Sequence, residues 1–193
     1  MKPDQCFYIP VIDARGSMLN DPVLIRHSDD HYWFSIADYD YLLYVLGVAD
    51  ALGLDVEIEE PDVSPLAVQG PKADDLMERI FGETVRDIGF FRYKRLPVEG
   101  KEMIVARSGY SRQGGFEIYV DGADYGMPLW NQLMAAGEDL EVRAGGPNGP
   151  ERIEGGLLSC RNDYTTDHSP HETGLSKYIT SPEDYLGLSL IHI

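Results

Sequence analysis

The sequence is poor in cysteine and in basic residues. Its 193 residues include two cysteines, Cys6 and Cys160, which lie far apart and lack the spacing of a metal site. We therefore expect reduced thiols, as in a cytoplasmic protein. The 16 Lys and Arg residues are outnumbered by 33 Asp and Glu residues, and the net charge is −17. This balance argues against nucleic acid or an anionic membrane as a partner, because phosphate contacts need clustered cations.

Long hydrophobic runs are also missing. No apolar run is long enough to span a bilayer, and the first residues lack a basic segment followed by an apolar core. Hydrophobic residues make up 43% of the chain and charged residues 25%, which is ordinary for a globular protein. A chain of this length can form one or two domains with a core. We expect a soluble, cytoplasmic protein.

Patterns that would indicate a metal or a dinucleotide are incomplete. Asp167, His168-Ser-Pro-His171 and Glu172 include metal-binding residue types. Two histidines around a proline, without a third clustered ligand pair, nevertheless favour a solvated loop. Neither Gly114-Gly115 nor Gly145-Gly146 follows a strand and opens a helix at the spacing of a dinucleotide fingerprint. We expect no bound metal and no dinucleotide.

The most informative stretch is a glycine-rich hairpin pattern over residues 106–120. Alternation along its second strand puts Phe116, Ile118 and Val120 on one face and Glu117 and Tyr119 on the other. A carboxylate at Glu117 can accept two parallel N–H bonds from a flat heterocycle with two adjacent donors, such as the pterin of folate. A solvent-facing strand gives the same pattern, and the pattern alone favours that interpretation.

Four blocks of sequence indicate a family. The stretch from Gly109 to Glu117, Gly-Tyr-Ser-Arg-Gln-Gly-Gly-Phe-Glu, resembles a signature of the glycine-cleavage T-protein family of folate-dependent one-carbon transferases. Three further blocks agree with this family in the same order: Gly16–Val23, Leu66–Ala73, and Arg152–Leu158 followed by Asn162-Asp163. Asn20–Val23 and Gln113–Glu117 are most similar to the family members that demethylate dimethylsulfoniopropionate.

The resemblance implies a tetrahydrofolate cofactor, a small-molecule methyl donor and a set of site residues. Asp21 is implied to face the folate and the reacting carbon as the catalytic residue, whereas an Asp before Pro by itself favours a structural turn. Several strand faces present an aromatic ring or a polar tip opposite an aliphatic face. An ordinary wet face is the alternative, but aromatic rings also suit a sulfonium cation. We assign to folate Tyr8, Ser35, Tyr110 and Glu117, and to the substrate Trp33 and Tyr119.

The expected reaction transfers a methyl group from dimethylsulfoniopropionate to tetrahydrofolate, giving methyl-tetrahydrofolate and methylmercaptopropionate. Two alternatives stay open. One is another family reaction, either glycine-cleavage aminomethyl transfer or demethylation of a methoxy-aromatic, and the other is folate binding without turnover. Asn148 stands where T-proteins carry an Arg, which counts against aminomethyl transfer. Arg92 stands where the demethylases are expected to have an aromatic residue, and Tyr110 stands where they are expected to have a Trp. These two differences leave the identity of the methyl donor undecided.

The expected fold class is α+β, with mixed, mainly antiparallel sheets and packed helices, as part of the T-protein folate-binding fold. We expect residues 1–62 to form a small α+β (ferredoxin-like) unit that carries Asp21, with a helix over residues 40–54 and a strand at 56–59. Residues 63–187 are expected to form the second half of the folate-binding domain. Residues 188–193 match a translated adapter sequence and are expected to be a non-native tail.

Further elements are expected in the second half of the chain. The patterns predict helices over residues 71–81, 124–136 and 151–159, and a hairpin that turns at Glu99-Gly100. The resemblance also implies that the family's N-terminal part and C-terminal barrel are absent from this sequence. We therefore expect the chain alone to bind folate weakly or to aggregate.

Overall fold

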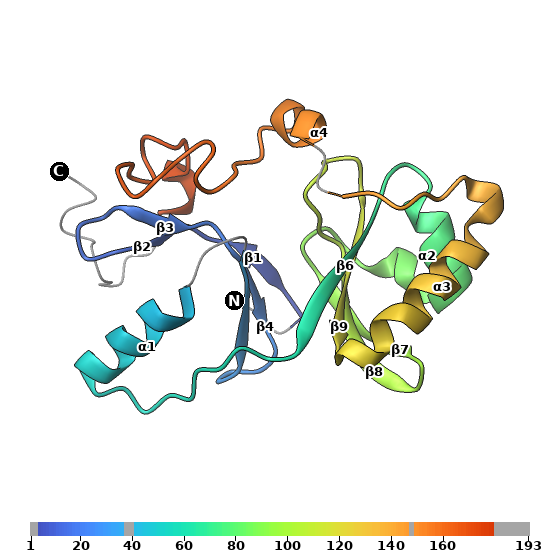
Figure 1. Cartoon of the computed structure of the whole chain (residues 1–193), viewed down its shortest axis with the longest axis horizontal. Helices are drawn as coiled ribbons and strands as arrows, with labels where there is room; N and C mark the ends of the chain where they lie inside the picture. The colour runs from blue at the N-terminus through green and yellow to red at the C-terminus, as the bar shows by residue number, and fades with distance from the viewer. Residues whose placement is uncertain (1–3, 37–40, 147–148, 180–193) are drawn as a thin grey trace. The chain divides into compact units, whose positions relative to one another are not determined.

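The computed structural model describes residues 4–36, 41–146 and 149–179, which divide into two compact units (Figure 1). The first unit contains the chain up to Cys6 and residues Pro61–Leu157. The second unit contains Phe7–Glu60 and the chain from Leu158 onward. The segment after Leu157, which the sequence placed with residues 63–187, thus groups with the N-terminal residues. The proposed tail, 188–193, lies outside the described residues.

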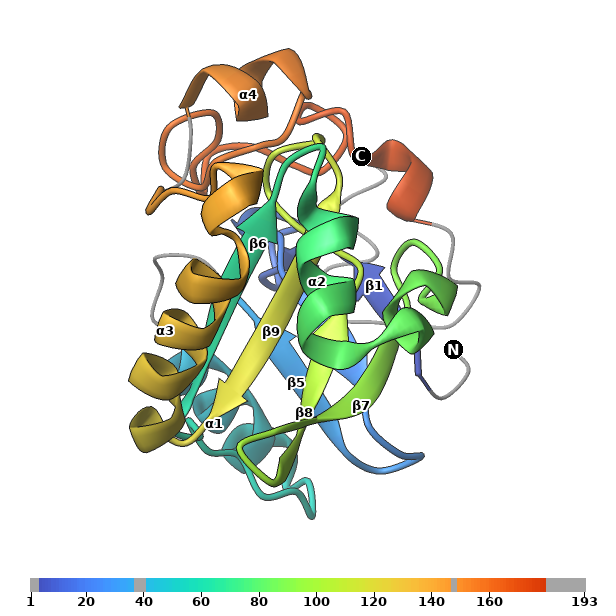
Figure 2. The same ribbon diagram turned by 90° about the vertical axis from the view of Figure 1, so that its right-hand side faces the viewer.

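The first unit is built on a four-stranded antiparallel sheet in the order β6-β9-β8-β7. Its strands are β6 (Val63–Gln69), β7 (Tyr93–Val98), β8 (Lys101–Ala106) and β9 (Gly115–Asp121). Two helices, α2 (Ala73–Phe81) and α3 (Gly126–Ala136), cover one face of this sheet (Figure 2). Pro65 is tolerated within β6 because β6 is an edge strand of this sheet. An edge strand has a neighbour on one side only, so a missing N–H group can face away from the sheet.

The core of the first unit lies between the sheet and these two helices. Alternation along β9 turns Phe116, Ile118 and Val120 toward the helices, as the sequence predicts. The other buried members of this core come from both helices, from β7 and β8, and from η1 (Glu83–Asp87) and its end: Leu76, Met77, Val85, Ile88, Leu96, Val98, Met103, Val105, Leu129 and Leu133. The opposite face of β9 is therefore left to Glu117 and Tyr119.

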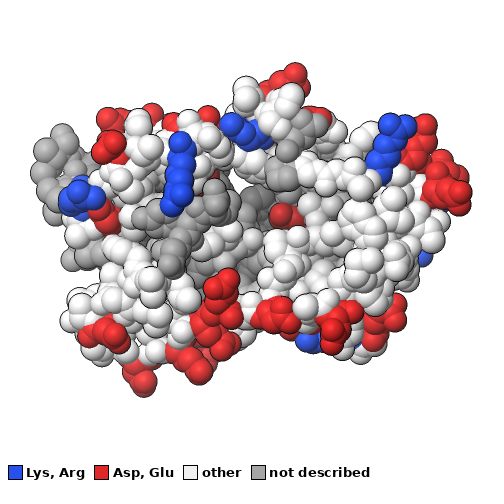
Figure 3. All heavy atoms as spheres, viewed as in Figure 1, with Lys and Arg blue, Asp and Glu red and all other residues white. Residues whose placement is uncertain are grey.

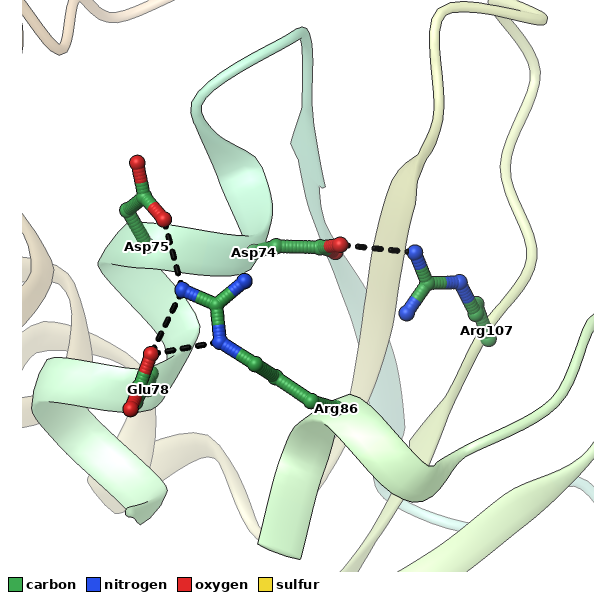
Figure 4. Close-up of polar contacts among 5 residues, drawn as sticks. All are labelled: Asp74, Asp75, Glu78, Arg86 and Arg107. Carbon is green, nitrogen blue, oxygen red and sulfur yellow. Dashed lines mark hydrogen bonds and ion pairs between the residues drawn. The ribbon is translucent and has the colours of Figure 1, made fainter. Parts of the chain in front are cut away.

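Charged side chains fasten α2 to its surroundings (Figure 4). Arg107, which follows β8, donates to Asp74 on α2 at 2.8 Å. Arg86 reaches back from η1 to Asp75 at 2.6 Å and to Glu78 at 2.5 Å. These side chains are partly exposed, and solvent-screened pairs contribute little free energy. They align the helix, whereas its buried face supplies most of the stability.

Within its described residues, the second unit contains two small sheets and one α-helix. β1 (Cys6–Tyr8), β4 (Val23–Arg26) and β5 (Tyr32–Ser35) form a sheet in the order β1-β4-β5, and β2 (Val11–Ile12) pairs with β3 (Met18–Asn20). The helix is α1 (Tyr41–Leu52). A small cluster of Met18, Tyr164 and Leu175 joins the N-terminal strands to the segment after Leu158.

The remaining elements are short. They are η2 (Ala123–Tyr125), η3 (Glu138–Leu140), α4 (Gly149–Glu154) and η4 (Ser176–Tyr178). Among the helices of the described residues, none combines the length and the apolar character needed to cross a membrane.

The predicted α+β class, with mainly antiparallel sheets and packed helices, is confirmed. The expected helix over residues 40–54 corresponds to α1. The expected strand at 56–59 is wrong, because residues 54–60 are irregular and acidic residues alternate there without a strand to pair with. The run from Cys6 to Ile12 breaks between β1 and β2 at Pro10, which has no N–H group for a sheet.

Candidate functional site

Asp21 lies in the two-residue connection between β3 and β4, where two tyrosines hold its carboxylate. The Tyr8 hydroxyl donates to Asp21 Oδ2 at 2.6 Å, and the Tyr164 hydroxyl donates to Asp21 Oδ1. The Asp21 N–H donates to the side-chain oxygen of Asn20 at 2.9 Å, and Asn20 is fully buried. All of these residues belong to the second unit, so this cluster is complete within it.

Burial and hydrogen bonding act in opposite directions on the Asp21 carboxyl group. Burial raises the pKa of Asp21, the two tyrosine hydroxyls lower it, and the nearby charge of Asp163 adds to the rise; the net pKa is raised. Burial and the bond to Asp21 raise the pKa of Tyr164 well above its usual range. Both tyrosines therefore act as donors, and the carboxylate is fixed in position with lone pairs left to accept a further bond.

The sequence analysis did not identify Tyr164 as part of this cluster. It is 1% exposed and follows directly after Asn162-Asp163, the end of the last family block. Its position next to a family block could have marked Tyr164 as a site residue. The contact with Asp21 could not be predicted, because the two residues are 143 positions apart along the chain. Tyr8 and Asp21, which were both predicted as site residues, are brought into direct contact by the structure.

The predicted residues Ser35 and Trp33 lie on β5, which pairs with β4. Ser35 is opposite Val23, at the end of β4 next to Asp21, and Trp33 is opposite Ile25, two pairs further along. The Trp33 ring lies 4.1 Å from the ring of His27, measured between centroids. Trp33 and Ser35 are half-buried. Ser35 is therefore placed near the Asp21 end of the sheet, whereas Trp33 belongs to an aromatic cluster on the hairpin.

Glu117 lies on β9 in the first unit, between two small side chains. Its partners on the neighbouring strands are Ala67 of β6 and Ala106 of β8, so short side chains flank the carboxylate on both sides. The Ser108 hydroxyl, which is buried, donates to Glu117 Oε2 at 2.5 Å. Burial raises the pKa of Glu117, and the Ser108 bond opposes this rise.

The other two predicted residues of this unit differ in exposure. Tyr119 is two residues further along β9, opposite Pro65 and Ile104, and is only 3% exposed. Tyr110 is 37% exposed and lies in the loop between β8 and β9. Tyr110 is thus accessible to a ligand, whereas Tyr119 packs within the chain.

The residues around Glu117 fit a flat ligand with adjacent N–H donors. The Ser108 hydroxyl engages Oε2, which leaves Oε1 and the second lone pair of Oε2. The flanking alanines leave room for a ring to approach the strand face, and Tyr110 offers a partly exposed aromatic ring. This donor and acceptor set is compatible with a pterin, the cofactor group implied by the sequence.

Four further residues that the sequence singles out, His168, His171, Arg92 and Asn148, are less informative. The His168 ring accepts the backbone N–H of Thr165 at 3.2 Å, and the His171 ring bonds the Ser176 hydroxyl at 2.9 Å, so each histidine is engaged within its own loop. Arg92 precedes β7, and its N–H donates to the carbonyl of Gly89. Asn148 lies outside the described residues.

Comparisons with known proteins agree with this architecture. The sequence profile of the family described as GCVT N-terminal domain matches residues 1–181. The chain is 65% identical over 187 residues to dimethylsulfoniopropionate demethylase DmdA of Ruegeria pomeroyi, covering 97% of this chain and 51% of that protein. It is 27% identical to an aminomethyltransferase of Caldanaerobacter subterraneus, covering 93% of this chain and 49% of that protein.

The fold is also found in a solved structure. The crystal structure of the glycine cleavage system aminomethyltransferase T from Bartonella henselae superposes with a TM-score of 0.82 at 20% identity, over 100% of this chain and 53% of that chain. The chain spans about half the length of the relatives that it matches. From the family profile, the sequence identity and the shared fold, we conclude that this chain belongs to the glycine-cleavage T-protein family.

Proposed function

We propose that the protein is a tetrahydrofolate-dependent methyltransferase that demethylates dimethylsulfoniopropionate. The products are methyl-tetrahydrofolate and methylmercaptopropionate. The observation that carries this proposal is the 65% identity to the Ruegeria pomeroyi demethylase, which extends over 97% of the chain and hence over both the Asp21 cluster and β9. Because the chain spans 51% of that relative, the activity is proposed for the whole protein.

Each predicted site residue has a role in this proposal. Asp21, held by Tyr8 and Tyr164, is the catalytic carboxylate that accepts or stabilises a proton at the reacting centre. Glu117, Tyr110, Tyr8 and Ser35 bind tetrahydrofolate, and Trp33 and Tyr119 contact the methyl donor through their aromatic rings. When bound, tetrahydrofolate supplies the nucleophilic nitrogen that receives the methyl group.

In this methyl transfer the main contribution of the protein is to position the two reactants. The sulfur of a sulfonium is already a good leaving group, so no acid is required to protonate it. The protein therefore has to hold the two reactants in line and to exclude water. A carboxylate whose two oxygens are fixed by tyrosine hydroxyls is suited to this task, because it does not have to reorganise during the reaction.

The free cysteines support the expected location. Cys6 and Cys160 are both unbridged, and burial raises the pKa of the Cys6 thiol to about 12, which keeps it protonated. Unbridged thiols are typical of a cytoplasmic protein, and we propose this compartment for the enzyme.

Substitutions at Asp21 and Glu117 distinguish a role in turnover from a role in tetrahydrofolate binding. We use this chain completed with the flanking segments of the Ruegeria pomeroyi relative. Asp21→Asn is expected to lower kcat by about 100-fold, in the range of a lost proton-transfer group, while tetrahydrofolate affinity changes little. Glu117→Ala is expected to weaken tetrahydrofolate binding by about tenfold, in line with one lost charge-assisted hydrogen bond. Asp55→Asn, an exposed carboxylate of the second unit, is the matched control.

Turnover assays and a fluorescence titration with tetrahydrofolate measure these effects. Unchanged activity in both Asp21→Asn and Glu117→Ala would show that the site is elsewhere. Each donor is also supplied separately. Aminomethyl transfer or loss of a methyl group from a methoxy-aromatic would identify a different family reaction, and tetrahydrofolate binding without methyl loss from any donor would indicate a binding protein without turnover.

A further inference from the structure

Two residues that the proposed function does not use lie directly behind Glu117. Ser108 is 3% exposed, and its hydroxyl donates to Glu117 Oε2 at 2.5 Å. Gln69, the last residue of β6, lies beside this pair. Ser108 is buried and Gln69 is half-buried, and both side chains contact the loop or strand that carries the carboxylate.

The Gln69 side chain ties the backbone of both partners together. Its Nε2 donates to the carbonyl oxygen of Ser108 at 3.1 Å and to that of Phe116, the residue before Glu117, at 3.1 Å. Its Oε1 accepts the hydroxyl of Ser111 at 2.7 Å. One amide group therefore fixes the start of the glycine-rich loop, a point within it, and the strand that carries Glu117.

The glycines of the loop make room for this arrangement. A Cβ added at Gly109 would lie 2.1 Å from Gln69 Oε1, and a Cβ added at Gly115 would lie 2.2 Å from the carbonyl oxygen of Val68. Both glycines also have positive φ angles, 154° and 135°, which L side chains rarely adopt. A glycine is thus required at position 109 for two reasons: the turn has a positive φ angle there, and a side chain would clash with the Gln69 amide.

We propose that Ser108 and Gln69 are positioning residues for ligand binding by Glu117: Ser108 holds one carboxylate oxygen, and Gln69 fixes the backbone of both partners so that the other oxygen faces the ligand. This inference rests on the proposed function for the identity of the ligand, a flat ring with adjacent N–H donors. The arrangement itself is independent of that identity.

The electrostatics of the pair agree with this role. Burial raises the pKa of Glu117, and the Ser108 hydroxyl counteracts the rise, so Ser108 keeps the carboxylate available as an acceptor. Burial and the charge of Glu117 raise the pKa of the Cys6 thiol, and Tyr93, Arg95 and Tyr119 lie on the same face of the sheet as Glu117. Asp4 lies close enough to Tyr93 for its charge to raise the pKa of that phenol. A titration must therefore follow the Glu117 carboxyl carbon itself, because only a site-resolved signal separates Glu117 from these groups.

The experiment follows the Glu117 carboxyl carbon by NMR during a pH titration, in the chain completed with the flanking segments of the Ruegeria pomeroyi relative. Ser108→Ala is expected to raise the Glu117 midpoint by about one pH unit, which is a tenfold change in proton affinity. Ser108→Thr, which keeps a hydroxyl, is expected to restore the original midpoint. Gln69→Leu is expected to shift the midpoint in the same direction as Ser108→Ala although Ser108 and Glu117 are both intact.

The controls make each outcome decisive. Ser64→Ala, an exposed serine on β6, should leave the midpoint unchanged. An unchanged midpoint in Ser108→Ala or in folded Gln69→Leu would overturn the proposal. If Gln69→Leu does not fold, Ser111→Ala replaces it, because it removes the hydroxyl that donates to Gln69 Oε1 and that accepts the Gln113 N–H within the same loop, while Gln69 itself is kept; a shift then supports the proposal, and no shift overturns it.

A second arm separates this inference from the function. Tetrahydrofolate is titrated into the completed protein, where Ser108→Ala should weaken binding about tenfold and Ser108→Thr should rescue it. Tetrahydrofolate that binds equally well to Ser108→Ala would overturn the positioning role. A shifted Glu117 midpoint with no tetrahydrofolate binding by the unaltered protein would leave the support of the carboxylate in place and remove the proposed function instead.

Discussion

At the residue scale, the chain holds two half-buried carboxylates, each with hydroxyl donors. Asp21 has two tyrosines and Glu117 has one serine. In both cases burial raises the pKa and the donors oppose the rise. An isolated buried charge would be expensive, and the hydroxyls reduce this cost without introducing a positive charge that would neutralise the carboxylate.

The raised pKa of Asp21 predicts how folding stability depends on pH. The folded state binds the Asp21 proton more tightly than the unfolded chain, so this group stabilises the fold below its unfolded pKa, and that stability is lost as the pH rises through the folded pKa. Asp21→Asn removes this dependence. The difference in unfolding free energy, variant minus original, should therefore increase between pH 4 and 7, by about 1.4 kcal/mol per unit of raised pKa.

Urea unfolding of the 193-residue chain at several pH values measures this difference. Glu117 contributes equally to both proteins and cancels. Asp55→Asn serves as the control and should show no comparable trend. A difference that stays constant or decreases as the pH rises would mean that the pKa of Asp21 is not raised in the folded state.

At the scale of elements, the hairpin between β7 and β8 shows how one turn sets the register of a sheet. Glu99 and Gly100 have φ angles of 48° and 83°, and Val98 pairs with Lys101. Positive φ at both turn positions suits the right-handed twist of the strands. The predicted turn at Glu99-Gly100 is confirmed, and it aligns Leu96 and Met103, which face the core.

Two substitutions in this turn should change the unfolding free energy in opposite directions. Asn adopts positive φ more readily than Glu, so Glu99→Asn should raise the unfolding free energy by about 0.5 kcal/mol. Gly100→Ala should lower it by about 1 kcal/mol; no atom lies within 4 Å of the added Cβ, so the cost is conformational. Thermal unfolding measures both variants. Glu102→Asn, on β8, is the control, and a gain there equal to that of Glu99→Asn would exclude the turn as the cause.

At the scale of the whole molecule, negative charge dominates. Acidic residues outnumber basic ones by 33 to 16, and red Asp and Glu side chains are prominent on the face drawn in Figure 3. Such an excess destabilises the compact state through repulsion between like charges. The ion pairs that oppose this repulsion, such as Arg79–Asp139 and Arg86–Asp75, are exposed, so each contributes little.

This balance predicts the response to salt. Raising NaCl from about 0.01 to 0.1 M shortens the screening length from about 30 to 10 Å, which weakens the long-range repulsion. The Tm of the chain should therefore rise, by about 2–4 °C for a gain of 1 kcal/mol. Differential scanning fluorimetry measures it, with NaCl rather than sulfate because sulfate also strengthens hydrophobic burial. A Tm that falls with NaCl would mean that the ion pairs outweigh the repulsion.

Local sequence patterns were enough to predict most helices and strands of the core, and the four sequence blocks were enough to indicate the family. Alternation placed Phe116, Ile118 and Val120 opposite Glu117, and helical spacing located α1, α2 and α3, because these signals depend on neighbours within a few residues. The same local signals failed at residues 56–59, where a strand needs a partner that the fold does not provide. The expectation that the chain alone binds folate weakly or aggregates remains a prediction.

The side chains that support the two carboxylates become visible once the chain is folded. Tyr164 reaches Asp21 across 143 residues, and Gln69 reaches the carbonyl groups of Ser108 and Phe116 across 39 and 47 residues. No local periodicity encodes such pairs, since they arise when strands distant in sequence become neighbours in a sheet or when a loop returns to a strand. The sequence therefore indicated Asp21 and Glu117, and the fold supplied the hydroxyl and amide groups that hold them.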